Sequence, residues 1–345
     1  WLANGLVDLR HDVTLFASGD SNIKGKLTAT SAQALAKSKI SDDLIKYYLS
    51  LQISKCYAQA NNFDIIHSHF TLLTSFYSCL VKTPTVQSIH SPIREELKPL
   101  LLNFKNNKYI SFSLAQRKTM PELNWTANIY HGVDTDRFSF NPAPQDYFLF
   151  LGRITEEKGV HLAIEAAKAA NMPLIIAGRS YPAEGYWHNQ IEKHIDGKMI
   201  RYVGEADLEK KIEWLRNAKG LLFPTQYAET FGLVMIEAMA CGTPVIGWDN
   251  GSVNEIIQDK KTGYVVKSLD EMVEAIKNID KISREETRKR AENFFSVKKM
   301  VRGYARIYER IIEEDRFKKK KEADRFLPKD IANLLLKFFQ KESGK

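Results

Sequence analysis

Cysteine is scarce in this chain of 345 residues. The three cysteines, Cys56, Cys79 and Cys241, lie far apart and have no CxxC spacing. A scattered, odd-numbered set predicts neither a disulfide framework nor a zinc site. Long apolar runs are lacking too, so the sequence offers no candidate for a helix that spans a bilayer. We therefore expect a cytoplasmic protein.

A glycine-rich GxGxxG turn is also missing. The chain opens with an amphipathic helix pattern over residues 1–9, and a buried-strand pattern over residues 12–17 follows. A doubly wound α/β domain begins with a strand and a glycine-rich turn ahead of its first helix, so we expect both to be truncated from this sequence. The lack of GxGxxG argues against a dinucleotide-dependent dehydrogenase, although a truncated start weakens that argument.

Acidic residues are outnumbered, because 50 Lys and Arg oppose 42 Asp and Glu, which gives a net charge of +8. Ten of these cations and four of these acids fall within residues 316–345, so the rest of the chain carries only +2. The excess belongs to the C-terminal tail, and we predict no nucleic-acid partner. After Pro328 an apolar stripe flanked by lysines predicts a basic amphipathic helix. Such a helix can make a peripheral contact with the membrane inner face or dock onto protein, and both alternatives stay open.

The length of the chain predicts two domains. Strand and helix patterns alternate in both halves, which is typical of parallel α/β sheets, and one short strand is predicted at residues 128–130. A Pro-rich stretch at residues 141–144 makes a suitable linker. We predict an N-terminal domain at 1–144, a second domain at 145–295, a closing helix at 296–312 that packs back on the first domain, and a basic tail at 313–345.

Histidines stand at the ends of two predicted strands of the first domain. His67 and His69 are two apart, and alternate strand positions share a face, so a metal site is one interpretation. No third ligand is close in the sequence, and a strand end facing the cleft between the domains is the interpretation that we favour. His90 ends the next strand, at the sheet edge where ligands of parallel α/β proteins bind.

The second domain begins with an apolar strand at residues 147–151. Gly152 and Arg153 follow it, and Lys158 comes five positions after Arg153. A loop with this spacing can wrap two cations around one diphosphate. Solvated surface charges would be the ordinary explanation of an Arg and a Lys in a loop. Their place at the mouth of a strand favours diphosphate binding.

The most informative stretch covers residues 221–266 and reads as strand, turn, helix, strand, short helix and strand. Glu229 lies just before the predicted helix of residues 233–240, and Glu237 lies about two turns inside it. Gly242 and Pro244 end this helix. A helix that opens straight after a strand directs unpaired N–H groups at an anion, so both carboxylates are expected to face one anion-binding cleft.

These motifs resemble those of retaining GT-B glycosyltransferases, specifically family 4, also called glycosyltransferase group 1. The resemblance rests on Glu229-x7-Glu237, on the GRITEEKG segment around Arg153 and Lys158, on the CGTPV sequence after the helix, and on GSVNEI ahead of Ile257. It covers nearly all of the chain before the tail. It implies an α/β, GT-B fold in which two Rossmann-like parallel-sheet domains face each other across a cleft, with the acceptor on the N-terminal side and the donor on the C-terminal side.

The resemblance also implies an enzyme, a hexosyltransferase of class EC 2.4, which moves a sugar from a nucleotide-diphosphate sugar to an acceptor hydroxyl. It implies retention of configuration and no metal or other cofactor. UDP-glucose is the expected donor by family frequency; GDP- and ADP-sugars stay open, and the acceptor is unidentified. The implied catalytic residues are His90, Arg153, Lys158 and Glu229. The implied donor-binding residues are Gly152, Arg153, Lys158, Gly204, Glu229, Thr230, Phe231, Gly232, Leu233 and Glu237.

Within this set the resemblance assigns Glu229 to the sugar hydroxyls and Glu237 to the ribose. Thr230 departs from the family, which commonly has Pro there, and we expect a change in loop stiffness. His131 stands where the family commonly has Asn, so we infer no role for it from the resemblance. Two alternatives stay open: a catalytically impaired GT-B scaffold that binds a partner, and a nucleotide-sugar epimerase of the same fold.

Overall fold

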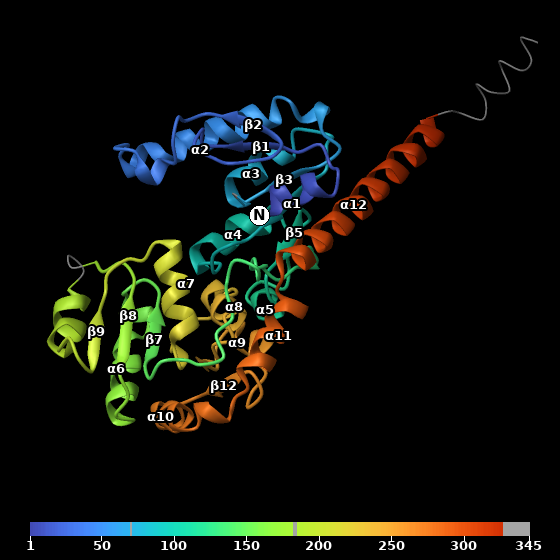
Figure 1. Cartoon of the computed structure of the whole chain (residues 1–345). Helices are drawn as coiled ribbons and strands as arrows, with labels where there is room; N and C mark the ends of the chain where they lie inside the picture. Colours follow the sequence, from blue (N-terminus) through green and yellow to red (C-terminus); the bar gives the residue numbers. More distant parts are fainter. Residues whose placement is uncertain (70, 182–184, 327–345) are drawn as a thin grey trace, which may run out of the picture.

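The computed structural model describes residues 1–69, 71–181 and 185–326, which form two α/β domains (Figure 1). The C-terminal domain is built on a six-stranded parallel sheet in the order β12-β11-β10-β7-β8-β9. Its strands are β7 (Phe148–Leu151), β8 (Leu174–Ala177), β9 (Ile200–Tyr202), β10 (Gly220–Phe223), β11 (Val245–Trp248) and β12 (Gly263–Val266). Counted from β7, this order is that of a doubly wound sheet, which switches direction between β7 and β10.

Both faces of this sheet are buried, because alternate residues of each strand point to opposite sides. Leu149, Leu221 and Phe223 pack on one side, while Phe148 and Leu222 pack on the other. The helices are α6 (Val160–Ala169), α7 (Leu208–Asn217), α8 (Leu233–Ala240), α9 (Val253–Ile256), α10 (Leu269–Lys277) and α11 (Arg284–Phe294). Residues of α7, α8, α9 and α11 join the first side, and residues of α6 and α10 join the second.

The N-terminal domain contains two separate parallel sheets. The larger one has the order β3-β4-β5-β6, and the smaller one pairs β1 with β2. The strands are β1 (Thr14–Ala17), β2 (Lys26–Ala29), β3 (Ile66–Ser68), β4 (Thr85–Ser88), β5 (Lys108–Ser111) and β6 (Trp125–Asn128). The helices are α1 (Leu2–Asp8), α2 (Asp42–Tyr57), α3 (Thr71–Ser78), α4 (Lys98–Leu102) and α5 (Leu114–Lys118). A cavity of about 840 Å³ is lined by residues of α1, α2, β1, β2 and β3, so it lies between the two sheets.

The chain passes between the domains twice, and the two passages lie side by side. The N–H of Val133 donates to the carbonyl of Phe295 at 2.7 Å, and Val133 also forms an isolated parallel β-bridge with Ser296. Gly132 is needed here, because a Cβ at this position would lie 2.7 Å from the Cα of Val297. We call this paired segment the hinge. The predicted boundary at residue 144 stays a prediction.

The last helix, α12 (Val297–Phe326), runs back along the N-terminal domain (Figure 1). Val301, Tyr304 and Ile311 join a core with Leu6 and Val86. The helix predicted at 296–312 corresponds to the first part of α12, which continues further because the following residues are good helix formers, including an i,i+4 pair of Asp315 with Lys319. The amphipathic helix predicted beyond Pro328 lies outside the described residues. Within the described part of the chain, no helix is long and apolar enough to cross a membrane.

Candidate active site

The candidate site lies at the switch point of the C-terminal sheet, where β7 and β10 are neighbours. Gly152 follows β7, Gly178 follows β8 and Gly204 follows β9. The N–H of Gly178 donates to the carbonyl of Gly204 at 2.8 Å, and a Cβ on Gly178 would lie 1.7 Å from the carbonyl oxygen of Gly152. The strand ends thus approach so closely that the backbone itself forms this edge of the site. Gly204 has open space around its own Cβ position.

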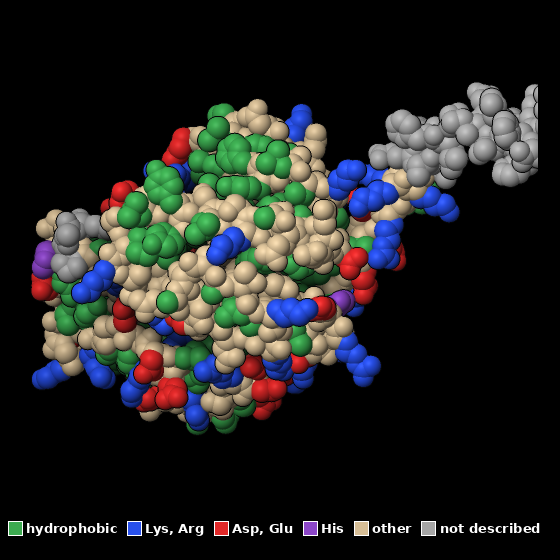
Figure 2. Space-filling view, turned by 90° about the horizontal axis from the view of Figure 1, so that it is seen from above, with side chains coloured by type: hydrophobic (Ala, Val, Ile, Leu, Met, Phe, Trp, Pro, Cys, Tyr) green, Lys and Arg blue, Asp and Glu red, His purple; other side chains and the backbone are tan. Residues whose placement is uncertain are grey.

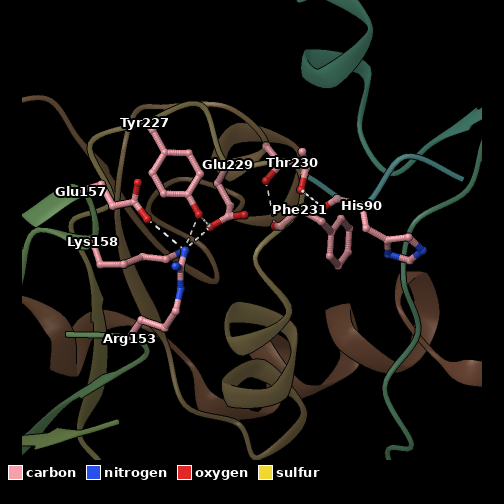
Figure 3. Close-up of polar contacts among 9 residues, drawn as sticks. His90, Arg153, Glu157, Lys158, Tyr227, Glu229, Thr230 and Phe231 are labelled. Atoms are coloured by element: carbon pink, nitrogen blue, oxygen red, sulfur yellow. Dashed lines mark hydrogen bonds and ion pairs between the residues drawn. The ribbon is translucent and has the colours of Figure 1, made fainter. Parts of the chain in front are cut away.

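A buried ion pair occupies the centre of the site (Figure 3). The Lys158 Nζ lies 2.5 Å from Oε2 of Glu229 and 2.6 Å from the hydroxyl of Tyr227. That hydroxyl also donates to Oε2 of Glu229 at 2.7 Å. The side chains of Lys158 and Glu229 are only 15% and 12% exposed. Burial, followed by the Glu229 charge, raises the pKa of Tyr227 well above its usual value, so its hydroxyl stays a donor.

Local backbone geometry brings Lys158 to this place. Lys158 ends the short helix η4 (Glu156–Lys158), and Gly159 follows with a φ of 71°. A Cβ on Gly159 would lie 2.2 Å from the carbonyl oxygen of Pro224, the residue after β10. Only glycine lets the turn after β7 approach the loop after β10 so closely. The sequence therefore brings the lysine of one loop to the glutamate of the next.

Arg153 lies at the outer side of the pair. Its Nη2 donates to Oε1 of Glu157 at 2.9 Å, and its side chain is 55% exposed. Residues 224–232, between β10 and α8, form the Glu229 loop. Figure 3 shows Arg153 and Lys158 on the same side of this loop, and the Arg153 charge also acts on Tyr227. The structure thus places the two predicted cations near each other. Lys158 is buried and paired, whereas Arg153 is more accessible.

Glu237 makes a second ion pair, which joins α8 to α7. It is buried within α8, and its Oε1 lies 2.6 Å from the Nζ of Lys211 on α7. Lys211 is not among the site residues predicted from the sequence. A signal existed, because Lys211 falls among the apolar residues Leu208, Ile212 and Leu215, which form the packed stripe of α7.

The segment from Thr230 to Leu233 contains the end of the Glu229 loop and the start of α8. Gly232 is the N-cap of α8, with a φ of 78° and no side chain to accept from the first N–H groups. A helix start of this kind suits an anion. Phe231 is buried, and Leu233 is 46% exposed at the rim. The hydroxyl of Thr230 donates to the carbonyl of His90 at 3.2 Å, a contact between the two domains.

His90 therefore meets the Glu229 loop through its backbone, while its ring turns away from Lys158 (Figure 3). Nε2 of His90 lies 2.7 Å from Nδ1 of His69, and the ring packs near His131 and Phe112. Burial lowers the pKa of His90, that of His69 to about 4 and that of His131 to about 3. These imidazoles are neutral at physiological pH.

The metal interpretation of His67 and His69 gains no support from the geometry. His67 instead contacts the Tyr308 hydroxyl at 2.5 Å and the Ser88 hydroxyl at 2.8 Å. Over residues 1–69, 71–181 and 185–326, no three His, Cys, Asp or Glu side chains are grouped in a way that could hold a metal ion.

Comparison with known proteins agrees with this geometry. Residues 133–294 match the model of the glycosyl transferases group 1 family. The chain is 25% identical over 334 residues to an uncharacterized glycosyltransferase of Methanocaldococcus jannaschii, an alignment that covers 90% of this chain and 92% of that protein.

Two solved structures share the fold. The sucrose-phosphate synthase of Thermosynechococcus elongatus gives a TM-score of 0.72 at 20% identity and covers 91% of this chain and 92% of that one. Anabaena HepE in complex with UDP-glucose gives a TM-score of 0.64 at 18% identity, over 83% and 85% of the two chains. The group 1 match over residues 133–294, the similar glycosyltransferase and the two-domain fold together show that the chain is a glycosyltransferase of the GT-B fold and a hexosyltransferase.

Proposed function

We propose that the protein transfers a sugar, glucose by default, from a UDP-linked donor to an acceptor hydroxyl, with retention of configuration and without a metal or other cofactor. The observation that carries this proposal is the buried pair of Lys158 and Glu229 at the switch point of the C-terminal sheet. The complex of the similar HepE with UDP-glucose supports the choice of donor.

In the free protein Lys158 is held by the Glu229 carboxylate. A bound diphosphate would offer Lys158 stronger, charged acceptors, since phosphate oxygens form charge-assisted hydrogen bonds with lysine. Glu229 would then be free to accept hydrogen bonds from the sugar hydroxyls beside the diphosphate. One ion pair thus keeps both groups in place until the donor arrives.

The reaction breaks the bond between the anomeric carbon and the diphosphate oxygen and forms a bond from that carbon to the acceptor oxygen on the same face. The acceptor proton passes to the leaving phosphate oxygen, so no separate base is required. Lys158, Arg153 and the first N–H groups of α8 stabilise the charge that develops on the diphosphate. These donors lower the barrier because they bind most tightly when that charge is greatest.

Glu237 is proposed to hold the ribose, with Lys211 fixing its carboxylate. His90 is proposed to face the donor sugar from the N-terminal domain, next to the Glu229 loop that its carbonyl contacts. Gly152 and Gly204 let the nucleotide approach the backbone at the strand ends.

Titration calorimetry with UDP, GDP and ADP in the presence of EDTA tests the proposal. We expect saturable binding of UDP that weakens by about 10- to 100-fold in Lys158→Ala, the loss of one hydrogen bond to a charged group. Glu237→Ala should also weaken binding. Binding that neither substitution changes would refute the donor site, and preference for GDP or ADP would refute UDP.

The proposal includes a peripheral contact with an anionic membrane. The end of α12 exposes the lysines at residues 318–321, and α2 exposes Leu44, Tyr47 and Leu51 along one side. Figure 2 shows hydrophobic side chains grouped on the N-terminal domain, with Lys and Arg side chains of α12 projecting at one end of the same face. Apolar and basic groups on one side of a molecule suit a surface of anionic lipid. Binding to vesicles of such lipid is the measurement that tests this contact.

A further inference from the structure

Glu255 connects the two domains through its carboxylate. It lies in α9 of the C-terminal domain, yet its Oε2 accepts the N–H of Leu114 at 2.8 Å and its Oε1 accepts the N–H of Ala115 at 2.7 Å. These are the first two residues of α5, in the N-terminal domain. Each oxygen of the carboxylate is therefore used by the other domain. Hydrogen bonds to a charged acceptor are stronger than those between neutral groups.

Tyr130 adds a third hydrogen bond from the N-terminal domain. Its hydroxyl donates to Oε2 of Glu255 at 2.9 Å. Burial, followed by the contact with Glu255, raises the pKa of Tyr130 to about 12, so the hydroxyl keeps its proton. The backbone of Glu255 is itself held, because Nη2 of Arg290 donates to its carbonyl at 2.9 Å. The Glu255 carboxylate thus extends toward the N-terminal domain from a backbone that Arg290 holds in place.

The other end of the same segment contacts the Glu229 loop. The N–H of Ser252 donates to the carbonyl of Glu229 at 3.1 Å, and the Ser252 hydroxyl donates to the carbonyl of Phe231 at 2.7 Å. A Cβ on Gly251, whose φ is 56°, would lie 2.4 Å from the Glu229 carbonyl oxygen. The segment from Gly251 to Glu255 is therefore a short connection between the Glu229 loop and the opposite domain.

This connection lies close to the hinge. Tyr130 precedes the Val133–Ser296 bridge by three residues, and its ring packs 5.6 Å from that of Phe295. A contact close to the hinge strongly affects the angle between the two domains, because a small displacement there becomes a larger one at the mouth of the cleft. Loss of the Glu255 contacts would therefore shift the N-terminal domain relative to the Glu229 loop.

We propose that Glu255 is a positioning residue that locks α5 of the N-terminal domain onto the Gly251–Glu255 segment, so that domain angle and Glu229 placement are set together. It acts on the reaction through the Glu229 loop and has no contact with the donor. The kinetic part of this inference rests on the proposed function; the structural part does not.

The test uses Glu255→Gln in the full chain. Glutamine has one oxygen, so it accepts only one of the two N–H groups of α5 and turns its own NH₂ toward the other. We expect amide hydrogen exchange to rise about tenfold in the peptide that holds Leu114 and Ala115, as for the loss of one hydrogen bond to a charged acceptor. Exchange in α8 should stay unchanged. Glu285→Gln, an exposed acid on α11, is the matched control.

The kinetic readout separates positioning from donor binding. In Glu255→Gln the transfer rate kcat should fall by about 10- to 100-fold, since misplacement by about 1 Å has effects of that size. The Kd for nucleotide should change by less than about threefold, because Lys158 and Glu237 are untouched. Tyr130→Phe removes only the third hydrogen bond and should lower kcat by about threefold to tenfold.

Unchanged exchange in α5 together with unchanged kcat would overturn the proposal. Faster exchange throughout the C-terminal domain would overturn it as well, because Glu255 would then support the fold in general. If Glu255→Gln does not fold, Tyr130→Phe decides the question by the same two readouts. A wild-type protein that binds no nucleotide would refute the proposed function instead, and the exchange in α5 would still decide the role of Glu255.

Discussion

The Lys158–Glu229 ion pair leads to a prediction about the stability of the protein, which can be tested without substrate. Lys158→Met keeps most of the apolar stem and removes the ammonium group, whose Nζ lies 5.9 Å from the ring centroid of Phe223 and 4.7 Å from that of Tyr227. The Glu229 carboxylate, 12% exposed, then loses its cation. Breaking a buried pair in this way costs about 3–5 kcal/mol. Because the Tyr227 hydroxyl still donates to Glu229, we expect a cost at or just below the lower end of this range, about 2–3 kcal/mol.

The double variant Lys158→Met/Glu229→Gln removes the orphaned charge. We expect its free energy of unfolding to return to within about 1 kcal/mol of the wild type, since replacing both members of a buried pair is often nearly neutral. Urea unfolding followed by circular dichroism measures all three proteins. Lys210→Met is the matched control, because Lys210 pairs with Glu213 at the exposed surface and little change is expected. Equal destabilisation in the single and double variants would refute the argument, since the loss would then come from packing.

Two further predictions concern pH and lipid. His69 and His131 have pKa values of about 4 and about 3 in the folded protein, below the unfolded value near 6.5, so the unfolded chain binds protons first as the pH falls. The free energy of unfolding should therefore fall below about pH 6.5, by about 1.4 kcal/mol per pH unit for each histidine. The His131→Asn variant should lose less stability than the wild type between about pH 6.5 and 4. The same pH dependence in the wild type and the variant would contradict this. In cosedimentation, the protein should bind vesicles that contain anionic lipid, where each lysine near the surface contributes about 1 kcal/mol, and should not bind neutral vesicles. Changing residues 318–321 to Glu should abolish binding. Equal binding to both kinds of vesicle would exclude the electrostatic contact.

The sequence was most informative where one short segment determines its own structure. The helix predicted at residues 233–240 is confirmed as α8, since its capping glycine and the following Gly242 and Pro244 define both ends. The strands on either side are confirmed as well, because continuous apolar runs of this length form buried parallel strands. Glu229, Lys158 and Arg153 accordingly lie at one sheet edge.

Features that depend on distant contacts were not predictable in the same way. The strand predicted at residues 128–130 lies at Trp125–Asn128, because pairing with β5, which includes a register shift, decides its position. Partner choice is another example: the spacing of Glu229 and Glu237 gives no sign that one meets Lys158 and the other Lys211. The orientation of the His90 ring toward His69 depends on how two strand ends pack.

The double passage at the hinge also affects the order in which the protein can fold during synthesis. The C-terminal domain is one continuous segment, so all the residues of its sheet, from Phe148 to Val266, are available before α12 is made. The N-terminal domain, in contrast, shares its core with Val301, Tyr304 and Ile311. The apolar side chains of Leu6 and Val86 therefore stay exposed until nearly the whole described chain has left the ribosome. The domain that is synthesised first is thus the one that completes its core last.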